Sequence, residues 1–247
     1  MENCNKVCIS LSGGLDSTML LMHYLHRGFE VRSYSFDYGQ RHNIELDKVK
    51  KNIVFLQEKG LPVSHQVINL RDAFSDSASS LYGSANGDIP KGDYEDDNMK
   101  STVVENRNVI FSSIIYGKAL GWANKTNSNV LISLGIHAGD HTIYPDTTPE
   151  SQAMARELFR ISNWGSEKVD YEAPFVNLHK DELLTTGIGA MRLMGFQDSD
   201  IETVLTNTHS CYSPDENGRS CGTCGTCRER LDAFAKAHIM DPIPYVV

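Results

Sequence analysis

The sequence lacks an excess of positive charge, a long apolar run and an apolar stretch at its start. Its 247 residues carry 23 Lys and Arg against 32 Asp and Glu, a formal net charge of -9. A protein that follows nucleic-acid phosphates needs a basic face, so this balance argues against stable nucleic-acid binding. No apolar run approaches the roughly 20 residues of a membrane span, and the opening MENCNK lacks the apolar core of a signal peptide. We therefore expect a cytoplasmic protein with no membrane partner.

Cysteine is scarce outside one C-terminal window. Two of the six cysteines, Cys4 and Cys8, lie near the start. The other four have the spacing C-x9-C-x2-C-x2-C and comprise Cys211, Cys221, Cys224 and Cys227. A secreted disulfide scaffold would be smaller and would distribute its cysteines more evenly. Four clustered thiolates suit a structural zinc ion, because they leave no open position, and an iron–sulfur cluster is the alternative.

The apolar pattern alternates between short runs and helical spacing. The short runs predict strands at 7–11, 31–36, 62–68 and 130–134. The helical spacing predicts helices at 18–25, 44–56, 109–123, 150–161, 180–194 and 228–238. This order predicts an α/β fold with a mainly parallel, Rossmann-like sheet flanked by helices. Residues 71–101, rich in Ser, Gly, Asp and Asn, are expected to form either a flexible flap near the active site or a plain surface insertion.

The string S-G-G-L-D-S-T, residues 12–18, stands between the first predicted strand and helix. Its two glycines let the backbone approach an anion closely, and the helix start offers amide groups and the positive end of a dipole. Ser12, Ser17 and Thr18 add hydroxyl donors for phosphate. Asp16 would repel phosphate directly, so we expect it to help hold Mg²⁺ or to cap the helix. The string is neither a Walker A loop nor a dinucleotide fingerprint.

This string resembles the pyrophosphate loop of the PP-loop ATPases, whose fold is of the adenine nucleotide alpha hydrolase type. These enzymes cleave ATP between its α and β phosphates to adenylylate a substrate. The resemblance implies nucleotide binding and activation of a carboxyl or carbonyl group by AMP, followed by attack of a nitrogen or sulfur nucleophile.

Further strings resemble the QueC family of 7-cyano-7-deazaguanine synthases across nearly the whole chain. In order they are LSGGLDSTMLL (11–21), YGQRH (38–42), Arg107-Asn108, GIHAGDHTIYPD (135–146), Lys180-Asp181-Glu182, HSCY, CGTCGTCRER and DPIPY (241–245). Each match is short, and their common order and spacing make the resemblance specific.

The resemblance implies an ATP-dependent ligase that forms a carbon–nitrogen bond. It would convert 7-carboxy-7-deazaguanine and ammonia into 7-cyano-7-deazaguanine, in queuosine and 7-deazaguanine biosynthesis, through an adenylylated acid and an adenylylated amide. Ammonia would come from solution, Mg²⁺ would bridge the ATP phosphates, Zn²⁺ would occupy the cysteine site, and the protein would be a homodimer.

The same resemblance implies roles for individual residues. The implied ATP-binding residues are Leu11, Ser12, Gly13, Gly14, Leu15, Asp16, Ser17, Thr18, Met19, Leu20 and Leu21. The implied catalytic residues are Asp16, Arg107 and Lys180, with surface salt bridges as the alternative for Arg107 and Lys180. The implied substrate-binding residues are Tyr38, Gln40, Arg41, Asn108, Asp140, His141, Tyr144 and Asp146.

Three places depart from the family pattern. Glu105-Asn106 stands where the family has Pro-Gly, residues 147–151 replace Cys-Arg-Pro-Glu-Phe, and His209 replaces Trp. The lost Arg predicts a change in how an anionic substrate is held. Two further hypotheses therefore remain: a QueC-like enzyme with a nucleic-acid or protein acceptor, and a non-catalytic, zinc-stabilised nucleotide sensor. We expect an ATPase domain over 1–204, with a zinc segment over 205–247 packed on it.

Overall fold

The core of the molecule is a five-stranded parallel sheet. The computed structural model describes residues 4–41, 43–83, 86–93, 97–137, 139 and 144–246. The strands are β1 (Lys6–Ser10), β2 (Glu30–Asp37), β3 (Val63–Asn69), β4 (Val130–Ser133) and β5 (Val169–Glu172). Their order is β3-β2-β1-β4-β5, and every pair is parallel. The expected α/β class and four predicted strands are confirmed, and β5 is an addition.

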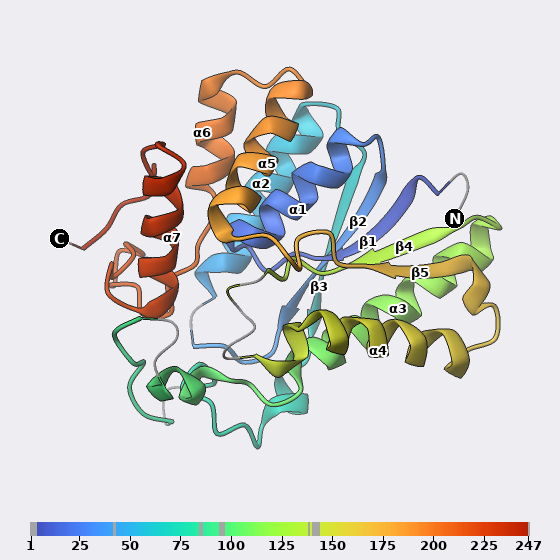
Figure 1. Cartoon of the computed structure of the whole chain (residues 1–247), viewed down its shortest axis with the longest axis horizontal. Helices are drawn as coiled ribbons and strands as arrows, with labels where there is room; N and C mark the ends of the chain where they lie inside the picture. Colours follow the sequence, from blue (N-terminus) through green and yellow to red (C-terminus); the bar gives the residue numbers. More distant parts are fainter. Residues whose placement is uncertain are drawn as a thin grey trace.

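Helices cover both faces of this sheet (Figure 1). They are α1 (Leu15–His26), α2 (Ile44–Glu58), α3 (Arg107–Thr126), α4 (Pro149–Ser162), α5 (Lys180–Leu193), α6 (Asp198–Thr206) and α7 (Gly225–Lys236). One apolar core joins α1, α2, α5 and α6 to one face, and a second joins α3 and α4 to the other. The six predicted helices are present, and α6 was not predicted.

Strand β1 shows why the sheet is buried on both sides. Val7 and Ile9 belong to the first core, whereas Cys8 between them belongs to the second, because successive side chains of a strand point to opposite faces. Helix α1 then packs closely on α5. A Cβ on Gly187 would lie 2.2 Å from the sulfur of Met19, so only glycine allows this approach.

The strand order reverses between β1 and β4. From β1 the chain adds β2 and β3 outward on one side, and it later returns to add β4 and β5 on the other. In open parallel sheets the crevice at the carboxyl ends of such strands is the usual ligand site. Residues 12–18, called the phosphate loop from here on, follow the end of β1 and therefore lie at this position.

A described part of the stretch 71–101 lies near the C-terminal segment in Figure 1. Within the described part of this stretch, Phe74, Leu81 and Met99 are buried. The amide of Gly92 donates to the carbonyl of Thr223 at 3.2 Å. These residues are packed on the body of the protein, and the predicted flap motion stays a prediction.

The chain after α6 returns to the phosphate loop. The amide of His209 donates to the carbonyl of Gly13 at 2.8 Å. Farther on, the fully buried guanidinium of Arg230 is held by Asp241 through two contacts of 2.7 and 2.9 Å and donates to Thr208 at 2.8 Å. Among the described residues, no helix has the length and apolar character needed to cross a membrane.

Candidate active site

A cleft opens at the carboxyl ends of β1, β2 and β4. Its lining comes from the phosphate loop, the end of β2, the starts of α2, α3 and α5, the loop after β4, and the C-terminal segment. Stretches far apart in the sequence thus converge on one hollow. The polar groups in it fall into three sets: the phosphate loop with its charged neighbours, an arginine among tyrosines, and the half-buried carboxyl group of Glu45.

The phosphate loop has a backbone that only glycine permits at Gly13. Its φ is +92°, and a Cβ there would lie 2.4 Å from the carbonyl oxygen of Glu45. The loop is braced from within, since the hydroxyls of Ser12 and Ser17 are 3.0 Å apart and the amide of Gly14 donates to Ser12 at 3.2 Å. Helix α1 begins within it, at Leu15. The free amides of a helix start and its dipole make this a ready anion site.

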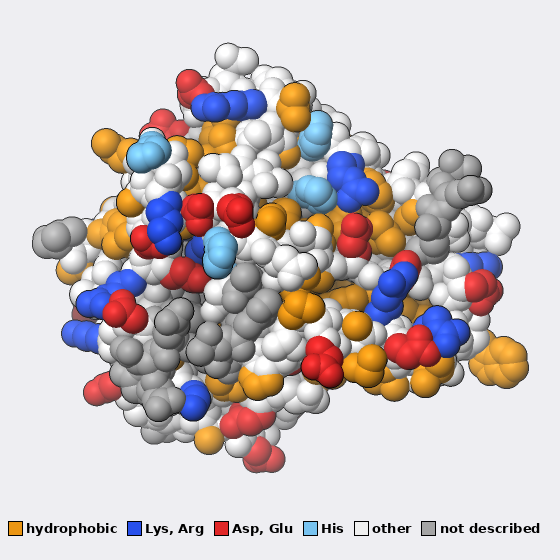
Figure 2. All heavy atoms as spheres, in the orientation of Figure 1, with side chains coloured by type: hydrophobic (Ala, Val, Ile, Leu, Met, Phe, Trp, Pro, Cys, Tyr) orange, Lys and Arg blue, Asp and Glu red, His pale blue; other side chains and the backbone are white. Residues whose placement is uncertain are grey.

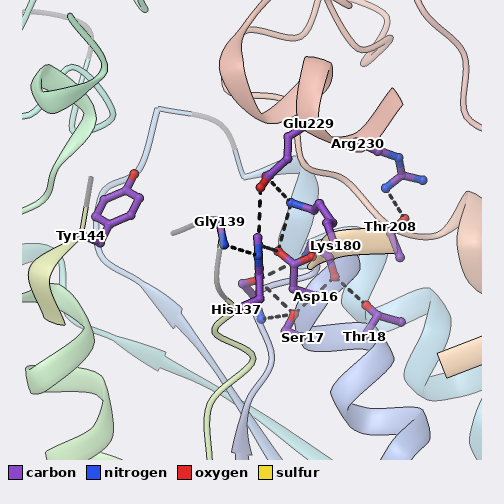
Figure 3. A network of polar contacts seen from close by, with 12 residues as sticks. Asp16, Ser17, Thr18, His137, Gly139, Tyr144, Lys180, Thr208, Glu229 and Arg230 are labelled. Atoms are coloured by element: carbon purple, nitrogen blue, oxygen red, sulfur yellow. Dashed lines mark hydrogen bonds and ion pairs between the residues drawn. The ribbon is translucent and has the colours of Figure 1, made fainter. Parts of the chain in front are cut away.

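A charged network lies beside the loop (Figure 3). The ammonium of Lys180, at the start of α5, is 3.3 Å from Asp16 and 2.7 Å from Glu229. His137 Nε2 is 3.5 Å from Asp16 and 3.9 Å from Glu229. Burial opposes the charge of Asp16, but Lys180 and His137 together hold its pKa below the ordinary value. Asp16 is therefore a carboxylate at neutral pH.

Sequence reasoning did not single out His137 and Glu229. His137 is fully buried, and its Nδ1 accepts from the amide of Gly139 at 3.2 Å. In a neutral ring the proton is then on Nε2, which faces the carboxylates of Asp16 and Glu229. Both residues stand in quoted family strings, GIHAGD and CRER. Glu229 is two residues from the metal-site cysteine Cys227, so its string was interpreted only as part of a zinc segment.

Arg107 occupies another part of the cleft. Burial opposes its charge, but the nearby phenol groups of Tyr38, Tyr144 and Tyr212 raise its pKa above the ordinary value. Tyr144 and Tyr212 are linked, with their hydroxyl oxygens 3.3 Å apart. Among the described residues Arg107 forms no salt bridge with a carboxylate. A permanently charged guanidinium surrounded by hydroxyls is suited to receive an anionic ligand.

The third set centres on Glu45 in the first turn of α2. Gln40 donates to the Oε1 of Glu45 at 3.2 Å and to the carbonyl of Phe36 at 3.1 Å, while its own oxygen accepts from the amide of Tyr38 at 2.9 Å. Burial is the main cause that raises the pKa of Glu45 to about 7, against the opposing effects of Gln40 and Arg107. Gln40 thus positions its neighbours and has little capacity left for a ligand.

The predicted binding residues divide between the cleft and the core. Those that line the cleft are Leu11, Ser12, Gly14, Asp16, Ser17, Tyr38, Gln40, Arg41, Arg107, Asn108, Tyr144 and Lys180. Leu15, Met19, Leu20 and Leu21 are fully buried in the apolar core, so their side chains hold α1 on the sheet. Thr18 donates to the carbonyl of Gly14 at 2.8 Å. Asp146 accepts from Asn108 at 3.3 Å. Asp140 and His141 lie outside the described residues.

The four C-terminal cysteines converge as their spacing predicts. All four sulfur atoms lie within 4.8 Å of one another, and those of Cys221 and Cys227 are 4.0 Å apart. A tetrahedral zinc ion with Zn–S bonds of about 2.3 Å requires sulfur separations of about 3.8 Å. The set therefore fits one ion, whereas the thiolates around a four-iron cluster are spread more widely. Cys224 is the N-cap residue of α7 and Cys227 lies in its first turn, so a metal here would fix the start of that helix.

A family model described as "Queuosine biosynthesis protein QueC" matches residues 6–238. The chain belongs to the QueC family. It is 37% identical over 240 residues to a 7-cyano-7-deazaguanine synthase of Pseudoalteromonas atlantica, covering 97% of this chain and 98% of the relative. The enzyme of that name from Marinobacter nauticus is 39% identical over 243 residues, covering 98% and 97%. One from Methanoregula boonei is 35% identical over 240 residues, covering 97% and 99%.

Membership of the QueC family confirms the resemblance seen in the motifs and implies the use of ATP. The structure also accounts for two departures from the QueC pattern. Asn106 has φ +56°, a left-handed conformation that Asn tolerates better than most residues, so it can stand where the pattern has Gly. Thr148 is the N-cap of α4 and accepts from the amide of Ser151 at 3.2 Å. At the position where the pattern has Arg, this chain therefore has a residue that caps a helix.

Proposed function

We propose that this chain is a 7-cyano-7-deazaguanine synthase. It uses ATP to convert 7-carboxy-7-deazaguanine and ammonia into the nitrile. The observation that carries the proposal is the joining of two anion sites in one cleft: a phosphate loop with Lys180, and Arg107 among tyrosines. Such a cleft can hold a nucleotide triphosphate and a small carboxylate together. The names of the relatives give the product, 7-cyano-7-deazaguanine, and the acid with a carboxyl group in place of the nitrile is 7-carboxy-7-deazaguanine.

The reaction needs two dehydrations, and adenylylation achieves both. In the first, a carboxylate oxygen attacks the α-phosphorus of ATP and pyrophosphate leaves. Ammonia then displaces AMP, which carries away that oxygen, and a proton is released as the amide forms. In the second, the amide oxygen attacks the α-phosphorus of another ATP and pyrophosphate leaves. AMP then departs with that oxygen while the nitrogen loses its two protons, and the nitrile forms. Each cycle converts a poor leaving oxygen into a good one.

The residues of the cleft have distinct tasks in this scheme. The backbone of residues 12–18 binds the pyrophosphate part of ATP, and Lys180 neutralises charge on it. Since Lys180 is paired with both Asp16 and Glu229, these carboxylates hold its ammonium in place until the phosphate arrives. Arg107 orients the substrate carboxylate. Groups fixed in advance in this way stabilise developing charge at little reorganisation cost.

Two metal ions complete the proposal. Mg²⁺ would accompany ATP, and the carboxylate of Asp16 is the group of the phosphate loop with the chemistry to help hold it. Zn²⁺ would be held by Cys211, Cys221, Cys224 and Cys227 as a structural ion. Its task would be to fix the start of α7 and thereby the position of Glu229.

The test is a product assay with purified protein, ATP, Mg²⁺, ammonium and 7-carboxy-7-deazaguanine, analysed by mass spectrometry. We expect the nitrile and AMP, and loss of both in an Asp16→Ala variant. ATP consumed with the acid returned unchanged would show that the acceptor is another molecule. If no ATP is consumed, the proposal that the protein is an ATP-dependent enzyme is wrong, and the nucleotide-sensor hypothesis is favoured.

We further propose that the chain forms an ATPase domain over 1–204, with the zinc segment over 205–247 packed on it. The protein would work in the cytoplasm and take its ammonia from solution.

We also propose that two copies form a homodimer. The exposed face of α4 supports the dimer. It carries a stripe of exposed apolar side chains, Met154, Leu158 and Ile161, and the exposed Trp164 follows two residues after the end of the helix. Hydrophobic atoms gather over α4 in Figure 2. Light scattering on the protein and on a Leu158→Glu variant tests it. A dimer unaffected by the substitution would exclude this face.

A further inference from the structure

The carboxyl group of Glu45 is a polar group of the cleft that the scheme above does not use. It lies in the first turn of α2 and lines the same cleft as the phosphate loop and Arg107. Among the residues that the structure describes, Glu45 forms no salt bridge, and the one hydrogen bond found for its side chain is that from Gln40 to Oε1. A carboxylate has about four acceptor positions, so most of its capacity faces the cleft.

Glu45 is held rigidly. Its backbone carbonyl presses on the phosphate loop so closely that a Cβ on Gly13 would lie 2.4 Å from it. Its side chain is fixed by Gln40, whose amide is in turn fixed by the backbone of Phe36 and Tyr38. This bracing at both ends is what a residue that discriminates between ligands needs, since a mobile carboxylate would adapt to either one.

The free acceptor positions of Glu45 call for a ligand with adjacent N–H donors. A guanine-type ring offers two side by side, the ring N1–H and the exocyclic 2-amino group, which match the two oxygens of one carboxylate. The adenine of ATP offers its exocyclic amine beside the N1 lone pair, which would face the second oxygen and repel it. The chemistry of Glu45 thus favours the deazaguanine ring over the nucleotide base.

We propose that Glu45 recognises the N1–H and 2-amino edge of the substrate ring while Arg107 holds its carboxylate. This inference rests on the proposed function, because it takes a deazaguanine acid as the ligand. In this arrangement the anionic Glu45 faces the N–H donors of the substrate ring, and the cationic Arg107 faces the substrate carboxylate. Burial already raises the pKa of Glu45 to about 7 in the free cleft, and paired N–H donors would compensate the ionised form for that burial.

The test compares 7-carboxy-7-deazaguanine with the analogue that lacks the 2-amino group, for the full-length protein and a Glu45→Gln variant. A hydrogen bond to a charged group is worth about 10- to 100-fold, so the wild type should disfavour the analogue by about that factor in kcat/KM. The variant should lose a similar factor with the natural acid and only a few-fold with the analogue. Its KM for ATP should stay within about twofold of wild type.

A matched control is Glu58→Gln, an exposed residue at the other end of α2, which should change neither ratio. Equal preference of the wild type for the two acids would overturn the inference without any variant, so misfolding cannot hide the answer. It is also overturned if the variant keeps the wild-type preference, or if the KM for ATP rises in its place, which would assign Glu45 to adenine. Turnover of neither acid by the wild type refutes the proposed function and the inference with it, and is recognised by the absence of any nitrile or amide.

Discussion

Replacing Lys180 by Met should damage both the stability and the chemistry of the protein. The Lys180 ammonium is buried and lies 2.7 Å from Glu229 and 3.3 Å from Asp16. Removing it leaves two carboxylates near each other, with the imidazole ring of His137 beside both. Breaking a buried ion pair costs about 3–5 kcal/mol. Because Asp16 and Glu229 are partly hydrated, we expect about 2–4 kcal/mol of lost unfolding free energy at neutral pH.

The loss should depend on pH in a defined direction. Lys180 and His137 lower the pKa of Asp16, so the stability that this gives is present above the unfolded pKa of about 3.9 and is lost as the pH falls through the folded value. The difference in unfolding free energy between Lys180→Met and wild type should therefore shrink on acidification. In the activity assay the same variant should lose about 10²- to 10³-fold in kcat, as expected for a lost electrostatic stabiliser.

Urea unfolding of Lys236→Met, of Glu229→Gln and of the double variant Lys180→Met with Glu229→Gln separates this explanation from general damage. Lys236→Met removes an exposed lysine of α7 that pairs with Asp232 and should leave the unfolding free energy almost unchanged. Adding Glu229→Gln to Lys180→Met should recover roughly half of the lost stability, without recovering kcat. A loss below about 1 kcal/mol in Lys180→Met, or no energetic coupling to Glu229, would refute the reasoning.

Three other predictions concern the cysteine site, the phosphate loop and the carboxyl group of Glu45. Cys224→Ser should reduce bound zinc, measured by atomic absorption, from one ion per chain to a fraction of that and should lower the melting temperature; iron with visible absorption in the wild type would contradict zinc. Gly13→Ala should lower the unfolding free energy by about 1–3 kcal/mol in urea, because φ is positive and the added Cβ would lie 2.4 Å from the carbonyl oxygen of Glu45. Gly189→Ala, in open space on α5, should raise it by about 0.5–1 kcal/mol. Equal effects would contradict the strain. The pKa of Glu45 is raised to about 7 in the folded protein, against about 4.3 in the unfolded chain. Between these two pH values the folded state binds more protons than the unfolded state, so the unfolding free energy falls as the pH rises. Glu45→Gln should stabilise the protein by about 1–3 kcal/mol at mildly alkaline pH and have little effect near pH 4; a pH-independent difference would contradict this account.

The sequence was sufficient where local chemistry determines structure. The string from Ser12 to Thr18 predicted a turn between a strand and a helix, and the spacing of the cysteines predicted their convergence. Both signals depend on neighbours in the chain. The missed strand β5 has the sequence VDYE, with only Val169 and Tyr171 apolar. Its Asp170 is held by an ion pair with Arg156, which no local pattern reveals.

The sequence does not predict that Glu229 joins the charged network, because the residues of the network are far apart in the chain. Lys180 and Glu229 are 49 positions apart, and they meet because α5 packs on α7. A carboxylate that follows a metal motif looks like any exposed glutamate until that packing is known. Glu45 was missed likewise, since the first turn of a helix favours an acidic residue for its dipole alone. Only the fold shows that its side chain lies in the cleft.

The central claim is that one cleft carries out both dehydrations by adenylylation. It is tested most directly with 7-carboxy-7-deazaguanine labelled with ¹⁸O in both carboxyl oxygens, followed by mass spectrometry of the products. The account predicts an unlabelled nitrile and one ¹⁸O atom in each of the two AMP molecules formed with it. Label in pyrophosphate, in inorganic phosphate or in water, with AMP unlabelled, would contradict it.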